Sequence, residues 1–447
     1  MAALPWSQYK RLLKAVPDWD HIGLVKRVVG LTVETTGPRA GIGDTCLIKA
    51  GKADLNEYAV PAEVVGFRDD RILMMPLGDL DGIAPGAVVT SSRQALGVPV
   101  GEALIGRVIN AVGQPLDNLG PIKGADMRPV GAKPPSPLLR QAISQPLSVG
   151  VRAIDTLITC GKGQRMAIMA GSGVGKSTLL AMMARYTSAD VNIIALIGER
   201  GREVKEFLER DLGPSGLARS VVVVATSDEP PLLRVRGALV ATVLAEYFRD
   251  RGADVLLMMD SLTRFAMAQR EVGLAVGEPP TTRGYTPSVF SLLPRLLERA
   301  GCGEKGTITG FYTVLVEGDD LSEPIADAVR SIVDGHIVLS RSLAEHNHYP
   351  AIDILASISR LMNQITAEEH RRAAGWVRDI LATYKDAEDL VNIGAYRRGS
   401  NPRIDLALEM IDPVNRFLMQ GVEERCDWQS GYTRLMQLVG MAPEHNK

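Results

Sequence analysis

The chain has 447 residues, a length that predicts about three domains, because one hydrophobic core rarely organises more than about 250 residues. Lys and Arg (50) nearly balance Asp and Glu (52), and a net charge of −2 argues against broad electrostatic binding to nucleic acid. The apolar runs are shorter than the roughly 20 residues that span a bilayer, and the first residues lack a signal-peptide pattern. The four cysteines are scattered without metal-ligand spacing. We therefore expect a soluble, cytoplasmic, multidomain protein with reduced thiols.

Two kinds of sequence precede the central part of the chain. Residues 1–20 place apolar side chains at roughly helical spacing among basic ones, which predicts an amphipathic helix that either docks a partner or folds back on its own domain. Residues 21–95 hold short β-rich runs separated by Gly, Pro and Asp, and their even spacing predicts a small β-barrel. A Pro-rich lead-in follows, and we expect it to wrap the surface without a core of its own.

The domain predicted over residues 96–345 alternates near-continuous apolar strands with helices, which is typical of an α/β fold with a parallel sheet covered on both faces. The expected strands are residues 165–170, 192–198, 220–225, 254–259, 307–316 and 335–340. Residues 346–447 form the last predicted domain, which becomes helical beyond Arg360. There the run Thr366–Glu369 predicts a capping box, and further helices are expected over residues 387–393 and 403–420.

A glycine-rich segment between a predicted strand and a predicted helix has the pattern of a phosphate-binding loop. Glycines leave room for the backbone to wrap closely around an anion, and the start of the following helix adds unpaired N–H groups. Lys176 would reach the β- and γ-phosphates of a nucleotide, and Ser177 would offer its hydroxyl to Mg²⁺. Ala170 replaces the first glycine of the strict pattern, a minor departure because alanine is also small. The predicted nucleotide-binding residues of the loop are Gly171, Ser172, Gly173, Val174, Gly175, Lys176, Ser177 and Thr178.

Two acidic residues stand where predicted strands end. In doubly wound sheets, ligands bind beyond the carboxyl ends of the strands, and Glu199 falls there. Its carboxylate could orient and polarise the water that attacks the γ-phosphate, although a charge that merely caps the next helix is the alternative. Asp260 ends the apolar run that begins at Asp254, and with a phosphate loop in the same domain it is expected to hold Mg²⁺ through water.

Taken together, these motifs resemble the α/β-subunit family of rotary ATP synthases, and within it the export ATPases of bacterial flagella and type III secretion systems. The order and spacing of the phosphate loop, Gly198–Arg200, Asp260 and Pro350–Ser359 carry the family resemblance. The resemblance to the export branch rests on residues 316–320, 323–327, 335–341 and 392–396. It implies an N-terminal β-barrel, a RecA-like nucleotide domain, a C-terminal helical domain, and a ring of six subunits with ATP and Mg²⁺ at the interfaces.

The resemblance also assigns roles to single residues. It implies that Glu199 activates water, that Arg200 is a neighbouring arginine on the phosphate side, and that Asp260 belongs to the second shell of Mg²⁺. Arg360 is similar to an arginine finger that each subunit gives to its neighbour's γ-phosphate. Tyr349 is similar to the aromatic residue that packs on adenine, with a plain core tyrosine as the alternative.

The family implies a homohexameric ATPase of protein export that is cytoplasmic and peripheral at the inner-membrane export apparatus. Its implied partners are a stator-like regulatory protein at the N-terminus, membrane proteins of the export gate, and export chaperones with their substrates. The pattern favours the flagellar branch and leaves a virulence secretion ATPase as the alternative. A noncatalytic ring subunit would lack Glu199. An RNA motor would need a base-stacking barrel, which one Phe and one Tyr support poorly, so no nucleic acid is expected.

Overall fold

The computed structural model describes residues 22–50, 58–92, 96–316 and 322–440. The residues up to Leu96 form one compact unit with two short later segments, and the remaining residues form a second unit. The predicted helix of residues 1–20 and the motif residues 317–320 lie outside the described part of the chain.

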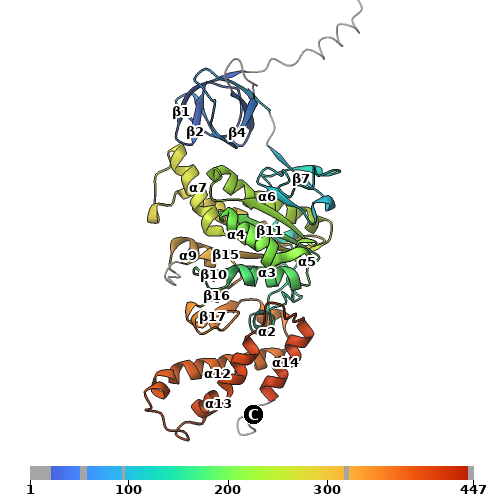
Figure 1. Cartoon of the computed structure of the whole chain (residues 1–447), viewed down its shortest axis with the longest axis vertical. Helices are drawn as coiled ribbons and strands as arrows, with labels where there is room; N and C mark the ends of the chain where they lie inside the picture. Colours follow the sequence, from blue (N-terminus) through green and yellow to red (C-terminus); the bar gives the residue numbers. More distant parts are fainter. Residues whose placement is uncertain (1–21, 51–57, 93–95, 317–321, 441–447) are drawn as a thin grey trace, which may run out of the picture. The chain divides into compact units, whose positions relative to one another are not determined.

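The N-terminal unit contains a closed barrel of six antiparallel strands, which confirms the predicted barrel (Figure 1). Its strands are β1 (Gly23–Val29), β2 (Thr32–Thr35), β3 (Thr45–Ala50), β4 (Tyr58–Arg68), β5 (Arg71–Pro76) and β6 (Val88–Ser91). They pair in the order β1-β2-β5-β4-β3-β6. Side chains alternate between the two faces of a strand, and in β4 this turns Val60, Ala62 and Val64 into the barrel core.

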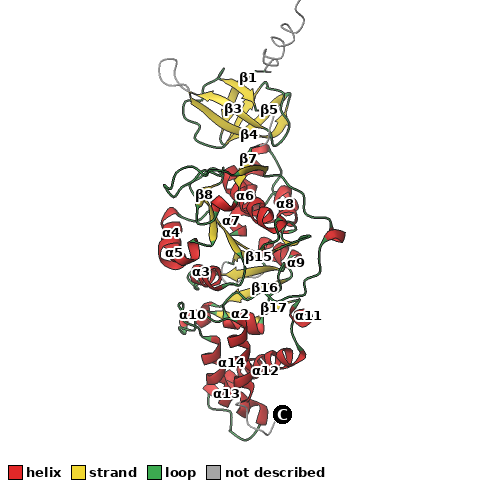
Figure 2. Cartoon of the chain, turned by 90° about the vertical axis from the view of Figure 1, so that its right-hand side faces the viewer, coloured by secondary structure: helices red, strands yellow, loops and turns green. Residues whose placement is uncertain are grey.

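A largely parallel sheet forms the centre of the second unit, with helices on both of its faces (Figure 2). The main strands are β8 (Val108–Asn110), β10 (Arg165–Ala170), β11 (Val191–Ile197), β12 (Ser220–Ala225), β13 (Asp254–Asp260), β15 (Thr307–Leu315), β16 (Gly335–Leu339) and β17 (Ile352–Ser359). They pair in the order β17-β16-β10-β15-β13-β11-β12-β8, and the short β14 (Gly301–Cys302) pairs with β15. Only β17 and β14 run antiparallel to their neighbours. The sheet confirms the predicted α/β class.

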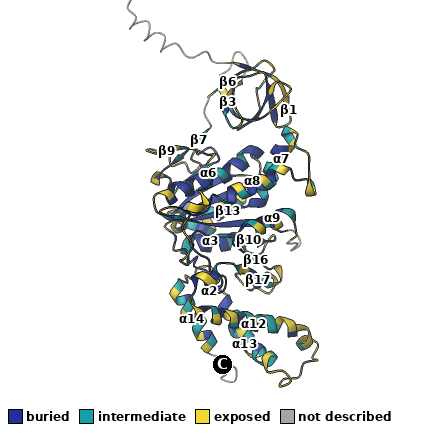
Figure 3. Cartoon of the chain, turned by 180° about the vertical axis from the view of Figure 1, so that it is seen from behind, coloured by how far each residue is buried: buried dark blue, intermediate teal, exposed yellow. Residues whose placement is uncertain are grey.

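Both faces of the central strands, such as β10, β11, β12 and β13, are buried, which explains why these strands are apolar at nearly every position rather than alternating (Figure 3). Successive residues of β11 show this, because Ile193 and Ala195 belong to one hydrophobic cluster while Ile194 and Leu196 belong to the other. The first cluster includes residues of α6 (Pro231–Asp250), α7 (Leu262–Val276), α8 (Pro287–Leu297) and α9 (Pro324–Ile332). The second includes residues of α2 (Arg152–Leu157), α3 (Lys176–Tyr186) and α4 (Gly201–Glu206).

The lead-in has no core of its own, as expected, but its first part joins the core of the second unit instead of wrapping the surface. Strand β8 pairs in parallel with β12, and Ile109 is fully buried against the central cluster. Strands β7 (Gly97–Val100) and β9 (Asp126–Pro129) form a separate two-stranded sheet. Apolar side chains of this segment would otherwise be exposed, and burying them against the sheet is favourable.

The C-terminal residues are helical, as predicted, but two local predictions are wrong. The helices are α10 (Arg341–Glu345), α11 (Met362–Ile365), α12 (Glu368–Asn392), α13 (Pro402–Leu418) and α14 (Trp428–Gly440). Thr366 forms no capping box, because its hydroxyl donates to the carbonyl of Met362 and the N-cap of α12 is Ala367. The helix expected over residues 387–393 is the end of α12 rather than a separate element. Within the described residues, none of the helices combines the length and the apolar character needed to cross a bilayer.

Candidate functional site

The carboxyl ends of β10, β11 and β13 surround a cavity of about 610 Å³, and most of the predicted site residues line it. The cavity size is in the range of small-molecule sites. Its lining includes Lys176, Glu199, Arg200 and Asp260, together with most of the phosphate loop. The structure thus brings together Lys176 and Asp260, which lie 84 positions apart in the sequence.

The loop between β10 and α3 has the backbone of an anion cradle. Gly173 and Gly175 have positive φ values of 80° and 85°, which side chains other than glycine rarely adopt. No atom lies within 4 Å of where a Cβ of Gly173 would stand, so the backbone is open on that side. Gly175 is the N-cap of α3 and has no side chain to cap the first turn. The first N–H groups of α3 are therefore available to a bound anion.

Lys176 links the loop to both acidic residues. Its Nζ lies 2.5 Å from Oδ1 of Asp260 and 3.5 Å from Oε1 of Glu199. The hydroxyl of Thr313 on β15 donates to the same Oδ1 of Asp260 at 2.7 Å. Burial opposes the charge of Lys176, but the two carboxylates outweigh it and raise the pKa of the ammonium. Lys176 therefore stays positive at neutral pH and faces the cavity as a fixed cation.

Glu199 has an environment suited to a group that exchanges protons near neutrality. Burial, followed by the charge of Asp260, raises the pKa of Glu199 to about 7, although Lys176 opposes this shift. Glu203, on the first turn of α4, is hydrogen-bonded to Glu199, and this bond lowers the pKa of Glu203. A partly buried carboxyl with a pKa near 7 at the edge of a cavity is a good candidate for general-base catalysis.

We expect the kcat/KM of the enzyme for ATP to fall below about pH 7, since kcat/KM reports the free enzyme and a protonated Glu199 cannot accept a proton from water. Activity should rise with pH through about 7, because the deprotonated form of Glu199 gains population over this range. Lys176 stays charged over this range and adds no limb of its own. A pH series from about 6 to 8.5, with assembly checked at each pH by light scattering, provides the measurement. A flat profile would contradict the assignment.

Arg200 lies at the edge of the cavity, as the N-cap of α4. Its side chain is 78% exposed and forms a 3.5 Å ion pair with Glu203. Tyr349 is 40% exposed and lies next to the phosphate loop, since a Cβ on Gly175 would stand 3.4 Å from the Tyr349 ring. The carbonyl of Tyr349 accepts a hydrogen bond from the N–H of Gln420 beyond α13.

Arg360 does not line this cavity. It follows β17 at the surface, where one Nη donates to the carbonyl of Arg330 at 3.1 Å. The structure therefore does not bring Arg360 to its own phosphate loop. An arginine that acts in the neighbouring site would show this separation.

Sequence reasoning missed three arginines that line the cavity, Arg210, Arg264 and Arg341. The Nε of Arg264 is buried and has no hydrogen-bond partner among the described residues, so the site offers an unsatisfied donor that an anion fits. A Cβ on Gly198 would stand 2.8 Å from the Cβ of Arg264, so glycine allows this close approach. A positional signal existed for Arg341, which follows directly on the predicted strand of residues 335–340, whereas Arg264 lies inside α7, near its start.

The oxygen ligands fit a magnesium ion that is held mainly by substrate phosphates. The described residues contain no group of three or more His, Cys, Asp or Glu side chains that could hold a metal alone. Mg²⁺ keeps several waters and commonly takes one or two protein oxygens beside phosphate oxygens. The hydroxyl of Ser177 and the carboxylate of Asp260 line the same cavity and can supply these oxygens.

A phosphate loop and two carboxylates at strand ends of a parallel sheet define a P-loop nucleotide-hydrolysing domain. Three parts of the chain match known protein families. Residues 150–359 match the nucleotide-binding domain of the ATP synthase alpha/beta family, and residues 25–93 match the β-barrel domain of that family. Residues 366–437 match the T3SS EscN ATPase C-terminal domain.

Relatives and solved structures agree with these matches. The chain is 54% identical to a flagellum-specific ATP synthase of Bacillus subtilis, over 96% of this chain and 97% of the relative. It is 52% identical to a type 3 secretion system ATPase of Xanthomonas euvesicatoria, over 96% of both chains. The assembled ATPase EscN from enteropathogenic E. coli superposes with a TM-score of 0.86 at 45% identity, and the match covers 93% of this chain and 100% of EscN. The chain belongs to the ATP synthase alpha/beta family, in its branch of flagellum-specific and type III secretion ATPases.

Proposed function

We propose that this protein hydrolyses Mg-ATP to energise bacterial type III protein export, and that its system is the flagellar one. The observation that carries the hydrolytic part is the contact of Lys176 with both Glu199 and Asp260 in one cavity. A noncatalytic nucleotide-binding subunit would not need a carboxyl such as Glu199 beside the phosphate loop. The export part is supported by the C-terminal domain match and by the names of the relatives.

The proposed mechanism assigns one task to each part of the cavity. Lys176, the loop N–H groups and Arg264 bind the phosphates, while Arg200 stands at the entrance on the same side. Ser177 and Asp260 would hold Mg²⁺, which would supply positive charge to the phosphate oxygens. Glu199 accepts a hydrogen bond from the attacking water and takes its proton. Tyr349, exposed beside the loop, offers an aromatic face on which adenine can stack.

The proposed working form is a homohexameric ring in which Arg360 of each subunit completes the neighbouring site. The surface position of Arg360 supports this proposal, since it leaves the chain's own cavity without that arginine. EscN has been solved as an assembled ATPase, and also in complex with its central stalk EscO. We propose a similar stalk partner here, a stator-like protein that binds the N-terminal segment, and contacts with export-gate proteins, chaperones and substrates at the inner membrane.

The choice between flagellar and virulence export is tested in the source bacterium. We expect chromosomal Lys176→Ala to abolish export, because the variant loses the cation that lies against Asp260. If the flagellar assignment is right, cells lose filament subunits from the culture medium and stop swimming, while other secretion systems keep working. Immunoblots of secreted filament protein, with Lys205→Ala as a control at an exposed position on α4, provide the measurement. Normal motility with loss of effector secretion would show the virulence assignment to be the right one.

A further inference from the structure

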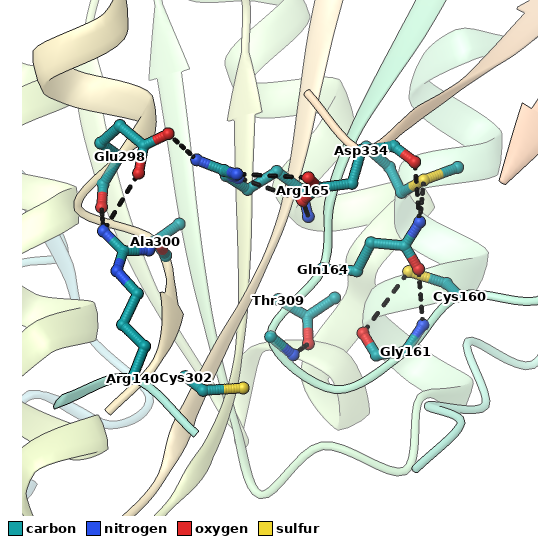
Figure 4. Close-up of polar contacts among 12 residues, drawn as sticks. Arg140, Cys160, Gly161, Gln164, Arg165, Glu298, Ala300, Cys302, Thr309 and Asp334 are labelled. Atoms are coloured by element: carbon teal, nitrogen blue, oxygen red, sulfur yellow. Dashed lines mark hydrogen bonds and ion pairs between the residues drawn. The ribbon is translucent and has the colours of Figure 1, made fainter. Parts of the chain in front are cut away.

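A buried glutamine lies at the opposite end of the strand that carries the phosphate loop. Gln164 directly precedes β10 and is fully buried (Figure 4). Its Oε1 accepts a hydrogen bond from the N–H of Gly161 at 2.8 Å. Its Nε2 donates to the carbonyl of Asp334 at 3.1 Å and to the hydroxyl of Ser359 at 3.0 Å. One side chain thus connects the start of β10 to the residues that precede β16 and end β17.

The two groups that accept hydrogen bonds from Gln164, on Ser359 and Asp334, are both directly connected to the backbone of Arg360. Ser359 is the residue before it, and the N–H of Arg360 donates to the same carbonyl of Asp334 at 3.0 Å. Asp334 is held in turn by Arg165, whose backbone N–H and Nε reach its carboxylate at 3.0 and 3.1 Å. Arg165 also forms an ion pair with Glu298, as Figure 4 shows. The backbone of Arg360 is therefore linked to Gln164, just before β10, and through Asp334 to Arg165, the first residue of β10.

We propose that Gln164 is a positioning residue for Arg360, and that it sets where the arginine reaches into the neighbouring subunit. This inference rests on the proposed action of Arg360 in the neighbouring site. Gln164 itself touches neither nucleotide nor Mg²⁺, since it lies at the amino end of β10 and the phosphate loop follows the carboxyl end at Ala170. Strand β10 pairs with β15 along its whole length and with β16 from Ala167 to Ala170. The strand that binds one subunit's phosphates therefore also holds the arginine offered to the next subunit.

The simpler explanation is that Gln164 only stabilises the folded chain. A matched control lies one residue away, where the N–H of Gly163 donates to the hydroxyl of Thr309 at 2.9 Å. Thr309 is 1% exposed, so this hydrogen bond is as buried as those of Gln164, yet it does not connect to Arg360. Thr309→Val removes it with little change in volume. The two substitutions thus separate loss of a buried hydrogen bond from loss of arginine positioning.

The test compares Gln164→Met, Ser359→Ala and Thr309→Val, each as an assembled full-length ATPase. We expect Gln164→Met to lower kcat by about 10-fold to 100-fold, since a shift of about 1 Å at a catalytic group costs that much. Ser359→Ala removes one of the hydrogen bonds and should lower kcat less, and it remains informative if Gln164→Met does not fold. Neither should change the Kd for a fluorescent ATP analogue, because the phosphate loop is untouched. Thr309→Val should lower the Tm similarly but keep kcat within about 2-fold of the parent.

The decisive measurement repeats these substitutions in an Arg360→Ala background. If Gln164 acts through Arg360, the double variant has the kcat of Arg360→Ala alone, because there is no side chain left to position. If kcat falls further by the same factor as in the parent, Gln164 acts independently and the inference is overturned. If instead Arg360→Ala by itself keeps full turnover, the proposed role of Arg360 has failed, and that result is recognisable without any Gln164 variant. An equal loss of kcat in Thr309→Val would also overturn the inference.

Discussion

Replacing Arg360 with alanine is expected to lower the kcat of the assembled ATPase by about 10³-fold, because an arginine finger contributes about 10³ to 10⁵ in nucleotide hydrolases. Arg360 lies at the surface and outside the cavity of its own chain, so its loss should leave the nucleotide contacts of that cavity intact. We therefore expect the Kd for ATP to change by less than about 3-fold, since the phosphate loop, Lys176 and Arg264 remain. Steady-state turnover and equilibrium binding of a fluorescent ATP analogue measure the two quantities separately.

Mixing two inactive variants tests whether Arg360 acts between subunits. Lys176→Ala disables the phosphate loop but keeps Arg360, whereas Arg360→Ala keeps the loop and lacks the arginine. In rings assembled from equal amounts, about a quarter of the interfaces combine an intact loop with an intact arginine from the next subunit. We expect activity to reappear on mixing and to reach up to about a quarter of the parent rate. A mixture that stays inactive although mixed rings form would show that the arginine acts within its own subunit.

The positions of the strands could be predicted from the sequence, whereas their order in the sheet could not. Strands buried on both faces are apolar at every position, so β10 and β12 stand out from the turns around them. The order depends on which edges meet in space, and β8 shows the difficulty. Its three residues lie in a Pro- and Gly-rich segment and pair with β12, more than 100 residues later. Pairing of so short a strand leaves no local signal in the sequence.

The candidate site could be predicted where one strand leads directly into one functional residue. The side-chain interactions between such residues could not be predicted from the sequence. The spacing of Lys176, Glu199 and Asp260 relative to predicted strands identified all three, because strand ends meet at one edge of the sheet. Thr313 and Gln164 were missed, since each acts by a side-chain hydrogen bond to an element distant in the sequence. Thr366 shows the opposite error, because its hydroxyl donates to the carbonyl of Met362 in the preceding turn instead of accepting a hydrogen bond from an N–H at the start of α12.

Replacing Glu199 with glutamine should remove turnover while nucleotide binding persists. Glutamine keeps the shape of the side chain but cannot accept a proton, and loss of a general base lowers the rate by about 10² to 10⁴. Glu199 lies 3.5 Å from Lys176, so the substitution also removes one carboxylate that competes with phosphate for the ammonium. We therefore expect the Kd for ATP to stay the same or to decrease. Quenched-flow measurement of a single turnover, with ATP retention on a filter, separates chemistry from binding.

Glu203→Gln provides the matched control, because Glu203 is the neighbouring carboxyl and is hydrogen-bonded to Glu199. Its side chain is 41% exposed and pairs with Arg200, so it does not replace Glu199 as a base. We expect kcat to fall by less than about 10-fold. The acidic limb of the kcat/KM profile should move to lower pH, because the charge of Glu203 that helps to raise the pKa of Glu199 is lost, while burial and Asp260 still act on it. In Glu199→Gln the limb should vanish from the residual activity. If Glu199→Gln kept the limb near pH 7, the titrating base would be another group, and Glu203 would be the first to examine because it shares the hydrogen bond.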